Sequence, residues 1–308
     1  MILGIDVGGT HTDAVLVDGF SVLKKAKVLT DERNLLNSLL SVSSALVDET
    51  VVNELERVVL STTISTNAIV QNKVDRVGML VVSGPGLPPS LYDVNQDTYF
   101  LSGYTNHRGI EMAPVNRKEA VHMKDRFRTE GIINVGIVGK FSTRNPSQEI
   151  ELQRLVSGEL RHVSLGHRMS GHLNFPRRIA TTYLNESIWS IHQRFVKQVI
   201  YFVKAQGIGV PIYILKADGG TFDITQSLEF PVQTILSGPA ASIMGIITAT
   251  DCRSDAIALD IGGTTTDISV FADGVPLFEP FGITIEGHKT LIRGLRTRSI
   301  GVGGDSVA

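Results

Sequence analysis

Cysteine is nearly absent from the sequence, which has one, Cys252, in 308 residues. An intrachain disulfide is therefore excluded, and a thiolate zinc site is disfavoured because it needs several cysteines. Long apolar runs are absent too, since none approaches the ~20 residues that cross a bilayer. The N-terminal apolar stretch is short, is broken by Asp6 and has no basic residues before it, unlike a secretory signal. We therefore expect a cytoplasmic protein that does not associate with membranes.

Net charge is also small, because 29 Lys and Arg residues are balanced by 31 Asp and Glu residues to give −2. Without a basic field that would attract a polyanion, we expect no nucleic-acid partner. Hydrophobic residues make up 42% and charged residues 19%, a composition that supports large cores and excludes intrinsic disorder. At ~150 residues per domain, the length indicates about two domains. Glycine alone is in excess, with 30 residues, or roughly 10% of the chain against a usual ~7%.

The strongest signal is a repeated nine-residue motif. Residues 5–13 read Ile-Asp-Val-Gly-Gly-Thr-His-Thr-Asp and residues 259–267 read Leu-Asp-Ile-Gly-Gly-Thr-Thr-Thr-Asp, so that six of nine positions are identical. Each copy follows an apolar stretch and leads into an alternating one, which predicts a strand, a Gly-Gly turn and a returning strand. Asp-Gly pairs at 18–19 and 273–274 indicate a further hairpin turn after each copy. Two copies so far apart indicate a duplicated structural unit.

Between the two copies the pattern alternates between strands and helices. We predict strands at 58–60, 77–82, 132–138, 163–165 and 211–217, and helices at about 33–50, just after 63, on either side of the 132–138 strand, at about 177–206 and at 239–249. Strands that alternate with helices predict an α/β fold.

The paired loops have the chemistry of a phosphate-binding site. A strand that ends in Asp and turns through Gly-Gly-Thr presents backbone N–H groups that no side chain covers. Because an aspartate repels phosphate, we expect a bridging cation, and Mg²⁺ commonly takes one or two carboxylates together with phosphate oxygens and water. Asp6 and Asp260 are the candidate metal ligands, and Asp13 and Asp267 are candidates for ordering water or metal. The candidate nucleotide-binding residues are Gly8, Gly9, Thr10 and Thr12 in the first copy and Gly262, Gly263, Thr264 and Thr265 in the second.

Two alternatives remain open at this point. A Gly-Gly-Thr sequence by itself is equally a tight hairpin, although two copies with the same aspartates and threonines favour the phosphate site. The glycine-rich turn with Gly301, Gly303 and Gly304 is compatible with a nucleotide contact or with an ordinary loop. No Walker-type Gly-Lys-Ser/Thr sequence occurs at the spacing that a P-loop requires.

These motifs resemble a known family. The two Asp-x-Gly-Gly-Thr loops resemble the phosphate motifs of the superfamily of actin, the sugar kinases and the seventy-kilodalton heat-shock ATPases, in which two ribonuclease-H-like domains close over ATP and Mg²⁺. More narrowly, further segments resemble the A-type subunit of the hydantoinase/oxoprolinase family, in the family's order. They are residues 60–68 (Leu-Ser-Thr-Thr-Ile-Ser-Thr-Asn-Ala), 218–220 (Asp-Gly-Gly), 236–241 (Leu-Ser-Gly-Pro-Ala-Ala) and 299–304 (Ser-Ile-Gly-Val-Gly-Gly).

The resemblance implies a duplicated ribonuclease-H-like fold. We expect the first half at 1–84, an inserted α/β region at 85–175, the completion of the first half at 176–250 and the start of the second half at 251–308. Family members normally continue well beyond the last motif, so we expect the second half to be truncated. The implied activity is ATP-dependent opening of a cyclic amide such as N-methylhydantoin or 5-oxoproline, with a B-type partner subunit. Related members serve in ketone carboxylases.

The resemblance also implies roles for individual residues. Phosphorylation of the amide oxygen would make the carbonyl carbon a better electrophile and the oxygen a better leaving group. The implied roles are Mg²⁺ binding through water for Asp6 and Asp260, phosphate binding for Thr10 and Thr264, orientation of the acceptor for Asp267, and proximity to the adenosine for Gly303 and Gly304. A further segment would face phosphate or substrate, unless it only caps a helix, and its candidate residues are Thr62, Thr63, Thr66 and Asn67.

Fold analogy alone does not separate a hydrolase from other proteins of this superfamily. The alternative function is a nucleotide-binding kinase, activator or regulatory module without hydrolase activity of its own. The sequence leaves open which cyclic amide is the substrate and whether the protein forms a homo-oligomer.

Overall fold

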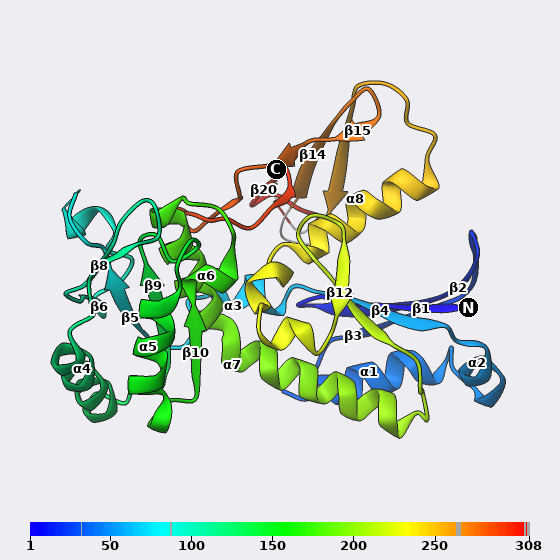
Figure 1. Cartoon of the computed structure of the whole chain (residues 1–308). Coiled ribbons are helices and arrows are strands. Elements are labelled where there is room, and N and C mark those ends of the chain that lie inside the picture. The colour runs from blue at the N-terminus through cyan, green and yellow to red at the C-terminus, as the bar shows by residue number, and fades with distance from the viewer. Residues whose placement is uncertain (32, 87, 263–265, 305, 307–308) are drawn as a thin grey trace. The chain divides into compact units, whose positions relative to one another are not determined.

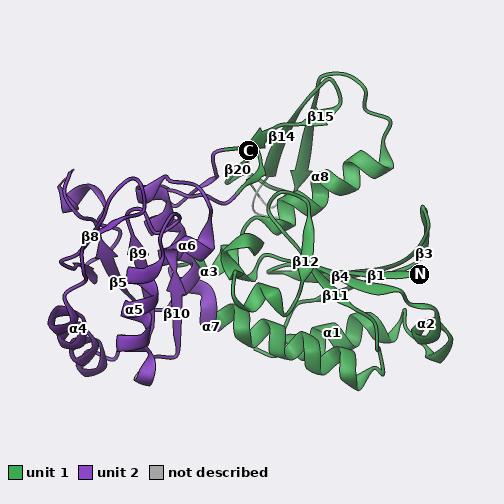
Figure 2. Ribbon diagram, in the orientation of Figure 1, with its two compact units in different colours: residues 1–71, 191–280, 293–308 green, residues 72–190, 281–292 purple. Residues whose placement is uncertain are grey.

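The computed structural model describes residues 1–31, 33–86, 88–262, 266–304 and 306. The predicted nucleotide-binding residues Gly263, Thr264 and Thr265 lie outside the described residues. The chain forms two compact units, which Figure 2 distinguishes by colour. Unit 1 comprises residues 1–71, 191–280 and 293–308, and unit 2 comprises residues 72–190 and 281–292. None of the helices in the described ranges is long and apolar enough to cross a membrane.

Unit 1 is built on a six-stranded mixed sheet with the strand order β12-β11-β4-β1-β2-β3 (Figure 1). Its strands are β1 (Ile2–Val7), β2 (His11–Asp18), β3 (Ser21–Leu29), β4 (Arg57–Thr62), β11 (Ile212–Leu215) and β12 (Thr221–Asp223). β1, β2 and β3 are antiparallel neighbours in sequence, whereas β1, β4 and β11 are parallel neighbours. Parallel neighbours need long crossover connections, which the helical segments between these strands supply.

Helices pack against this sheet. They are α1 (Leu35–Ser44), α2 (Glu49–Glu54), α3 (Ile64–Val70), the second part of α7 (Phe175–Ala205) and α8 (Ser237–Ala249), with short 3₁₀ turns η3 (Gln226–Leu228) and η4 (Pro231–Thr234). Leu3, Ile5 and Val7 of β1 are buried in one cluster with Leu39 of α1 and Phe202 of α7. Alternate residues of β1 therefore fill the core, as the period of two of a strand requires.

The second copy of the repeated motif begins another sheet in unit 1. β13 (Ala256–Ile261), β14 (Thr266–Ala272) and β15 (Val275–Pro276) are successive antiparallel neighbours, and β20 (Thr297–Ile300) also pairs with β14. β16 (Phe278–Glu279) pairs with β19 (Gly294–Leu295).

The two copies differ in burial. Leu3 and Ile5 are 0% and 3% exposed, whereas Ile257 and Leu259, which occupy the matching positions of the second copy, are 68% and 55% exposed. The repeated sequence pattern thus forms the same strands, with the apolar face covered in the first copy and exposed in the second.

Unit 2 contains a four-stranded parallel sheet with the order β10-β9-β5-β6. Its strands are β5 (Val77–Val82), β6 (Thr98–Phe100), β9 (Asn134–Gly139) and β10 (His162–Leu165), and its helices are α4 (Arg117–Thr129), α5 (Ser147–Val156), α6 (Gly166–Met169) and the first part of α7, with η1 (Pro89–Leu91) and η2 (Ser157–Glu159). Two short hairpins complete it, β7 (Tyr104–Thr105) with β8 (Glu111–Ala113) and β17 (Thr284–Ile285) with β18 (His288–Lys289). β5 and β9 are buried along their whole length, which is typical of parallel strands covered on both faces.

The predicted α/β class is confirmed, the structure adds that both large sheets contain parallel strands, and each predicted strand between the two copies is present. The prediction of one helix at 33–50 is wrong, because the structure has α1 and α2 there instead. The reason is Asp48, whose carboxylate accepts a hydrogen bond from the N–H of Val51 at 2.9 Å and so starts a second helix.

A buried histidine makes the stability of unit 1 sensitive to acid. His192 of α7 is 1% exposed, and its Nε2 lies 2.8 Å from the hydroxyl of Ser227. That hydroxyl donates to the carbonyl of Ile224, which leaves its oxygen to accept a hydrogen bond from the Nε2–H of His192. Burial lowers the pKa of His192 to about 3.

We expect His192→Gln to flatten the dependence of stability on pH. The pKa of His192 in the folded protein lies below the ordinary value of 6.5. The unfolded chain therefore binds a proton at this residue more readily than the folded chain. As a result, the free energy of unfolding has its full value above pH 6.5 and decreases as the pH falls towards 3. The slope from one such group is about 1.4 kcal/mol per pH unit. Urea unfolding at several pH values below 6.5 measures it. His122→Gln, on the exposed face of α4, is the matched control. An unchanged slope in His192→Gln would contradict the assignment.

Candidate active site

The two copies of the motif form hairpins with the same register. Asp6 of β1 lies opposite Asp13 of β2, and Asp260 of β13 lies opposite Asp267 of β14. The Gly-Gly turn of the first copy follows directly after β1, and in the second copy Gly262 follows directly after β13. The sequence repeat is therefore a repeat of geometry, with one pair of facing aspartates beside each turn.

The first turn is tightly bonded. The N–H of Gly8 donates to the carbonyl of His11 at 3.0 Å, and a Cβ on Gly8 would lie 2.8 Å from that same carbonyl oxygen. The hydroxyl of Thr30 donates to the carbonyl of Gly8 at 2.9 Å and contacts the hydroxyl of Thr12 at 2.9 Å. Thr12 is fully buried, so it supports the turn from inside, whereas Gly9 and Thr10 are exposed. Of the four candidates in this copy, Gly9 and Thr10 are the most accessible to a ligand.

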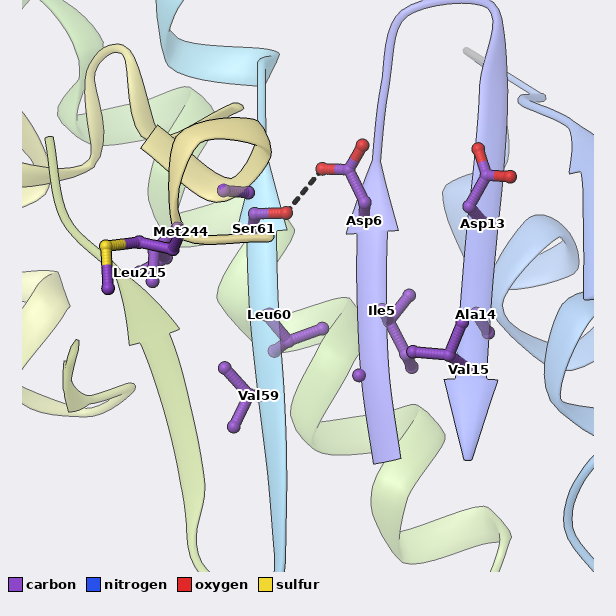
Figure 3. A pocket seen from close by; sticks show the side chains of 12 residues that line it. Ile5, Asp6, Asp13, Ala14, Val15, Val59, Leu60, Ser61, Leu215 and Met244 are labelled. Atoms are coloured by element: carbon purple, nitrogen blue, oxygen red, sulfur yellow. Dashed lines mark hydrogen bonds between the residues drawn. The ribbon is translucent and has the colours of Figure 1, made fainter. Parts of the chain in front are cut away.

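Asp6 combines partial burial with a nearby negative charge. It accepts a hydrogen bond of 2.5 Å from the hydroxyl of Ser61 on β4 (Figure 3). Asp13 forms an ion pair of 3.2 Å with Lys27 of β3. Burial raises the pKa of Asp6, and the carboxylates of Asp13 and Asp260 raise it further, while the Ser61 hydrogen bond and the charge of Lys27 oppose the shift. Ionised Asp6 is thus less favourable here than in water, and a bound cation would favour it.

The second hairpin is held by serines from other elements. Asp260 accepts a hydrogen bond from Ser242 of α8 at 2.5 Å, and Asp267 accepts one from Ser299 of β20. Both aspartates are therefore oriented by hydroxyl donors, as Asp6 is by Ser61.

The last glycine-rich motif lies beside the second turn. The N–H of Gly304 donates to the carbonyl of Gly262 at 2.9 Å, and the hydroxyl of Thr266 donates to the carbonyl of Val302 at 2.6 Å. The N–H of Gly303 donates to the hydroxyl of Ser306 at 2.9 Å, and Gly301 is exposed. Two motifs that the sequence separates by almost 40 residues thus form one backbone surface.

A cavity of about 300 Å³ opens between the first hairpin and α8 (Figure 3). Asp6, Asp13 and Ser61 line its polar end, and the remaining lining residues are mostly apolar and come from β1, β2, β4, β11 and α8. Met244 and Ala241 are the residues of α8 in this lining. A pocket with an apolar wall and a few convergent polar groups is the usual form of a small-molecule site.

The segment around α3 has two different roles. The backbone of Thr62 is bonded on both sides by the hydroxyl of Ser237, with Thr62 N–H to Ser237 Oγ at 3.3 Å and Ser237 Oγ to Thr62 O at 2.9 Å. The hydroxyl of Thr66 accepts the N–H of Leu236 at 3.0 Å, and Leu236 has the left-handed φ of 60°. Thr62 and Thr66 therefore hold the start of α8 in place.

Asn67 is different, because it borders the first turn. Its Nδ2 donates to the hydroxyl of Thr63 at 3.2 Å, and a Cβ on Gly9 would lie 2.9 Å from that nitrogen. Of the four residues predicted to face phosphate or substrate, Asn67 is thus the one beside Gly9 of the first turn, and Thr63 is its hydrogen-bond partner.

The site has carboxylate oxygens of the kind that bind Mg²⁺. No group of three or more His, Cys, Asp or Glu side chains in the described part of the chain is placed to hold a metal ion. Mg²⁺ commonly binds through one or two carboxylates and keeps several waters, and the facing pair Asp6 and Asp13 offers oxygen ligands of that kind. The assignment of Mg²⁺ to Asp6 and Asp260 stays a prediction.

Sequence comparisons identify relatives over the whole chain. The model of the hydantoinase/oxoprolinase N-terminal region matches residues 2–160, and the hydantoinase/oxoprolinase model matches residues 178–308. The chain is 26% identical to the caprolactamase subunit alpha of Pseudomonas jessenii, over 99% of this chain and 48% of that protein. It is 21% identical to the acetophenone carboxylase gamma subunit of Aromatoleum aromaticum, over 99% of this chain and 47% of that protein.

Solved structures share the fold. The nucleotide-free structure of acetone carboxylase matches with a TM-score of 0.86 and 20% identity, over 98% of this chain and 48% of that chain. The ATP-dependent caprolactamase from Pseudomonas jessenii matches with a TM-score of 0.78 and 22% identity, over 99% of this chain and 48% of that chain. The chain thus spans about half the length of these relatives.

We expect Asp6→Asn to stabilise the protein at neutral pH. The folded-state pKa of Asp6 is raised, so the folded protein loses stability as the pH rises from the ordinary value of 3.8 through the raised value. Asparagine removes this loss. Thermal unfolding across this pH range measures the gain, which should shrink as the pH falls towards 3.8. Asp18→Asn, at the exposed end of β2 in the same unit, is the control. A less stable Asp6→Asn variant at neutral pH would contradict the expectation.

Gly8→Ala tests the tightness of the first turn. Its Cβ would meet a backbone oxygen at 2.8 Å, so the turn must shift. We expect a loss of about 1–3 kcal/mol in the free energy of unfolding, the usual cost of overpacking. Gly209→Ala is the matched control, because no atom lies within 4 Å of the added Cβ. Equal stability of the two variants in chemical denaturation would show that the turn is not tightly constrained.

Proposed function

Because the chain belongs to the hydantoinase/oxoprolinase family, we propose that it is the nucleotide-binding part of an ATP-dependent hydrolase subunit that opens a cyclic amide of the hydantoin or 5-oxoproline type. The observation that carries this proposal is the pair of hairpins in one register, with Asp6 facing Asp13 and Asp260 facing Asp267. Two such turns offer backbone N–H groups and carboxylates for a nucleotide and its cation.

The proposed architecture is a duplicated ribonuclease-H-like fold. The antiparallel β1-β2-β3 meander followed by parallel β4 and β11 supports a first half of this kind, and the β13-β14-β15 meander supports the start of a second. The proposed boundaries are 1–84 and 176–250 for the first half, 85–175 for the inserted region and 251–308 for the second half.

The proposed reaction activates a carbonyl that is otherwise a poor electrophile. The amide oxygen attacks the γ-phosphorus of ATP, the bond from that phosphorus to the β-γ bridging oxygen breaks, and ADP leaves. Water then adds to the carbonyl carbon, and the C–N bond of the ring breaks with protonation of the nitrogen, which leaves an acyl phosphate. A second water attacks the carbonyl carbon of this acyl phosphate, the bond from that carbon to the former amide oxygen breaks, and phosphate leaves with that oxygen. The products are the ring-opened acid, ADP and phosphate.

The chain's own residues have defined parts in this proposal. Asp6 and Asp260 would hold Mg²⁺, which neutralises phosphate charge when it is bound. Thr10 and Thr264 would bind phosphate oxygens, and Asp267 would orient the attacking group. Asn67 and Thr63 lie at the first turn, where an amide and a hydroxyl can contact phosphate or substrate. Positioning of this kind is the main protein contribution to phosphoryl transfer.

The relatives favour the ATP-dependent class and leave the substrate to be identified. Caprolactamase is named for a lactam, which is a cyclic amide, and its solved structure is described as ATP-dependent. Acetone carboxylase is described by ATP-dependent acetone carboxylation, which makes a carbonyl-activating carboxylase subunit the second candidate function. The caprolactamase and acetophenone carboxylase relatives are both named as subunits, which supports a partner subunit for this chain, proposed here to be of the B type.

The decisive experiment measures ADP release and ring opening together. The complete protein, with and without its B-type partner, is incubated with Mg-ATP and hydantoin, 5-oxoproline, caprolactam or acetone with bicarbonate. The proposal predicts that a cyclic amide stimulates ADP release and is opened in equal amount. ADP release without ring opening would favour the kinase, activator or regulatory alternative, and turnover of the ketone alone would favour the carboxylase.

Two substitutions test the proposed ligands in the same assay. We expect Asp6→Asn and Asp260→Asn each to weaken Mg-ATP binding at least about tenfold, a typical cost of losing support for a bound metal, and to reduce turnover. Asp18→Asn is the control. Unchanged Mg-ATP affinity and turnover in both variants would refute the metal assignment.

A further inference from the structure

Unit 2 contains a second cavity, of about 370 Å³, which the proposed function does not use. Three segments that are far apart in the sequence form it. They are residues 91–94 after β5, residues 174–180 at the start of α7, and residues 287–289 of the β17–β18 hairpin. Tyr92 lines one wall, and its buried ring packs edge to face on the buried ring of Phe175 behind it, with centroids 5.0 Å apart.

The opposite wall belongs to a strap, residues 281–292, which is anchored to α7. Nη1 of Arg177 donates to three strap carbonyls, those of Phe281 at 2.5 Å, Gly282 at 3.2 Å and Thr290 at 3.1 Å. The N–H of Leu291 donates to the hydroxyl of Thr181 at 2.9 Å. The wall is therefore preformed.

The strap also requires glycine at one position. Gly282 has a φ of +105°, and a Cβ there would lie 2.0 Å from the carbonyl oxygen of Thr290. A preformed site loses less entropy on binding than one that must be ordered by its ligand.

Charged side chains of both signs line this cavity without neutralising one another. Lys289 and Asp93 form no ion pair within the described ranges, and Arg177 uses Nη1 for all of its side-chain hydrogen bonds there. By contrast, Arg76 of the same unit forms ion pairs with Asp97 and Glu130, each at 2.7 Å. Two cations and one anion around a concave surface are complementary to a ligand that carries both charges.

We propose that this cavity binds a small amino carboxylate, with the carboxylate held by Arg177 and Lys289 and the ammonium group by Asp93. The side chain of His288 lies in the same lining, where its ring contacts Tyr183 at a centroid distance of 5.7 Å and closes the side of the cavity. The apolar lining of Ala180 and Val94 suits the methylene chain between the two charged groups. The site lies within one unit and does not depend on nucleotide binding.

Calorimetric titration without nucleotide tests the proposal. The probes are 6-aminohexanoate, which has both charges, and hexanoate and hexylamine, which have one each. We expect the wild-type chain to bind 6-aminohexanoate more tightly than either single-charge probe. Lys289→Met should weaken binding of 6-aminohexanoate and of hexanoate about tenfold, which corresponds to about 1.4 kcal/mol for one lost charge contact. Asp93→Asn should weaken binding of 6-aminohexanoate but leave binding of hexanoate unchanged or tighter.

Lys118→Met, which removes an exposed lysine of α4 outside the cavity, is the matched control. All three substituted side chains are exposed, so the variants should fold, and circular dichroism checks this. No binding of 6-aminohexanoate at millimolar concentration, or an equal loss in Lys118→Met and Lys289→Met, would overturn the proposal. Because the readout needs no ATP, this outcome is independent of the proposed hydrolase activity.

Discussion

The register of β1 is the constraint on which the candidate active site depends. At Asp6, β1 meets Asp13 of β2 on one side and Ser61 of β4 on the other. The buried residues that alternate with Asp6 hold this register, because a shift by one residue would turn the whole apolar set of β1 away from the core. The packing that stabilises the sheet therefore also brings two carboxylates and a hydroxyl to one end of the same cavity.

Burial and charge oppose each other at that point. Asp6 is partly desolvated next to another carboxylate, and the hydroxyl of Ser61 and the ammonium group of Lys27 compensate only in part. Functional groups are often kept in such unfavourable surroundings because a ligand relieves them. In the second hairpin Ser242 and Ser299 supply similar hydroxyl contacts from a helix and a strand, although Asp260 is exposed. The same local chemistry is thus built twice from different supporting elements.

Local features of this fold could be predicted from the sequence, whereas features set by distant partners could not. The repeat predicted both hairpins, because Gly-Gly turns and alternating apolar residues are local signals. The lone motif at 299–304 did not predict its contact with the second turn, which depends on the pairing of β20 with β14. Ser61, Ser237 and Ser299 stood in motifs without an assigned role, and nothing in the sequence singled out Ser242 or Lys27. Equivalent apolar residues, such as Ile5 and Leu259, differ in exposure because burial depends on the layer packed above them.

The strap has a consequence for how the polypeptide is made. Unit 2 takes residues 72–190 and 281–292, so the chain passes from one unit to the other four times. The carbonyls that receive the guanidinium of Arg177 are 104 to 113 residues further along the chain. During synthesis the start of α7 forms before these carbonyls exist, because residues 191–280 of unit 1 are made in between. A gene fragment that ends after residue 190 would encode the parallel sheet of unit 2 without the buried side chains of Ile283, Ile285 and Ile292. The contacts within the chain thus divide it into two units, but neither unit is one continuous stretch of the sequence.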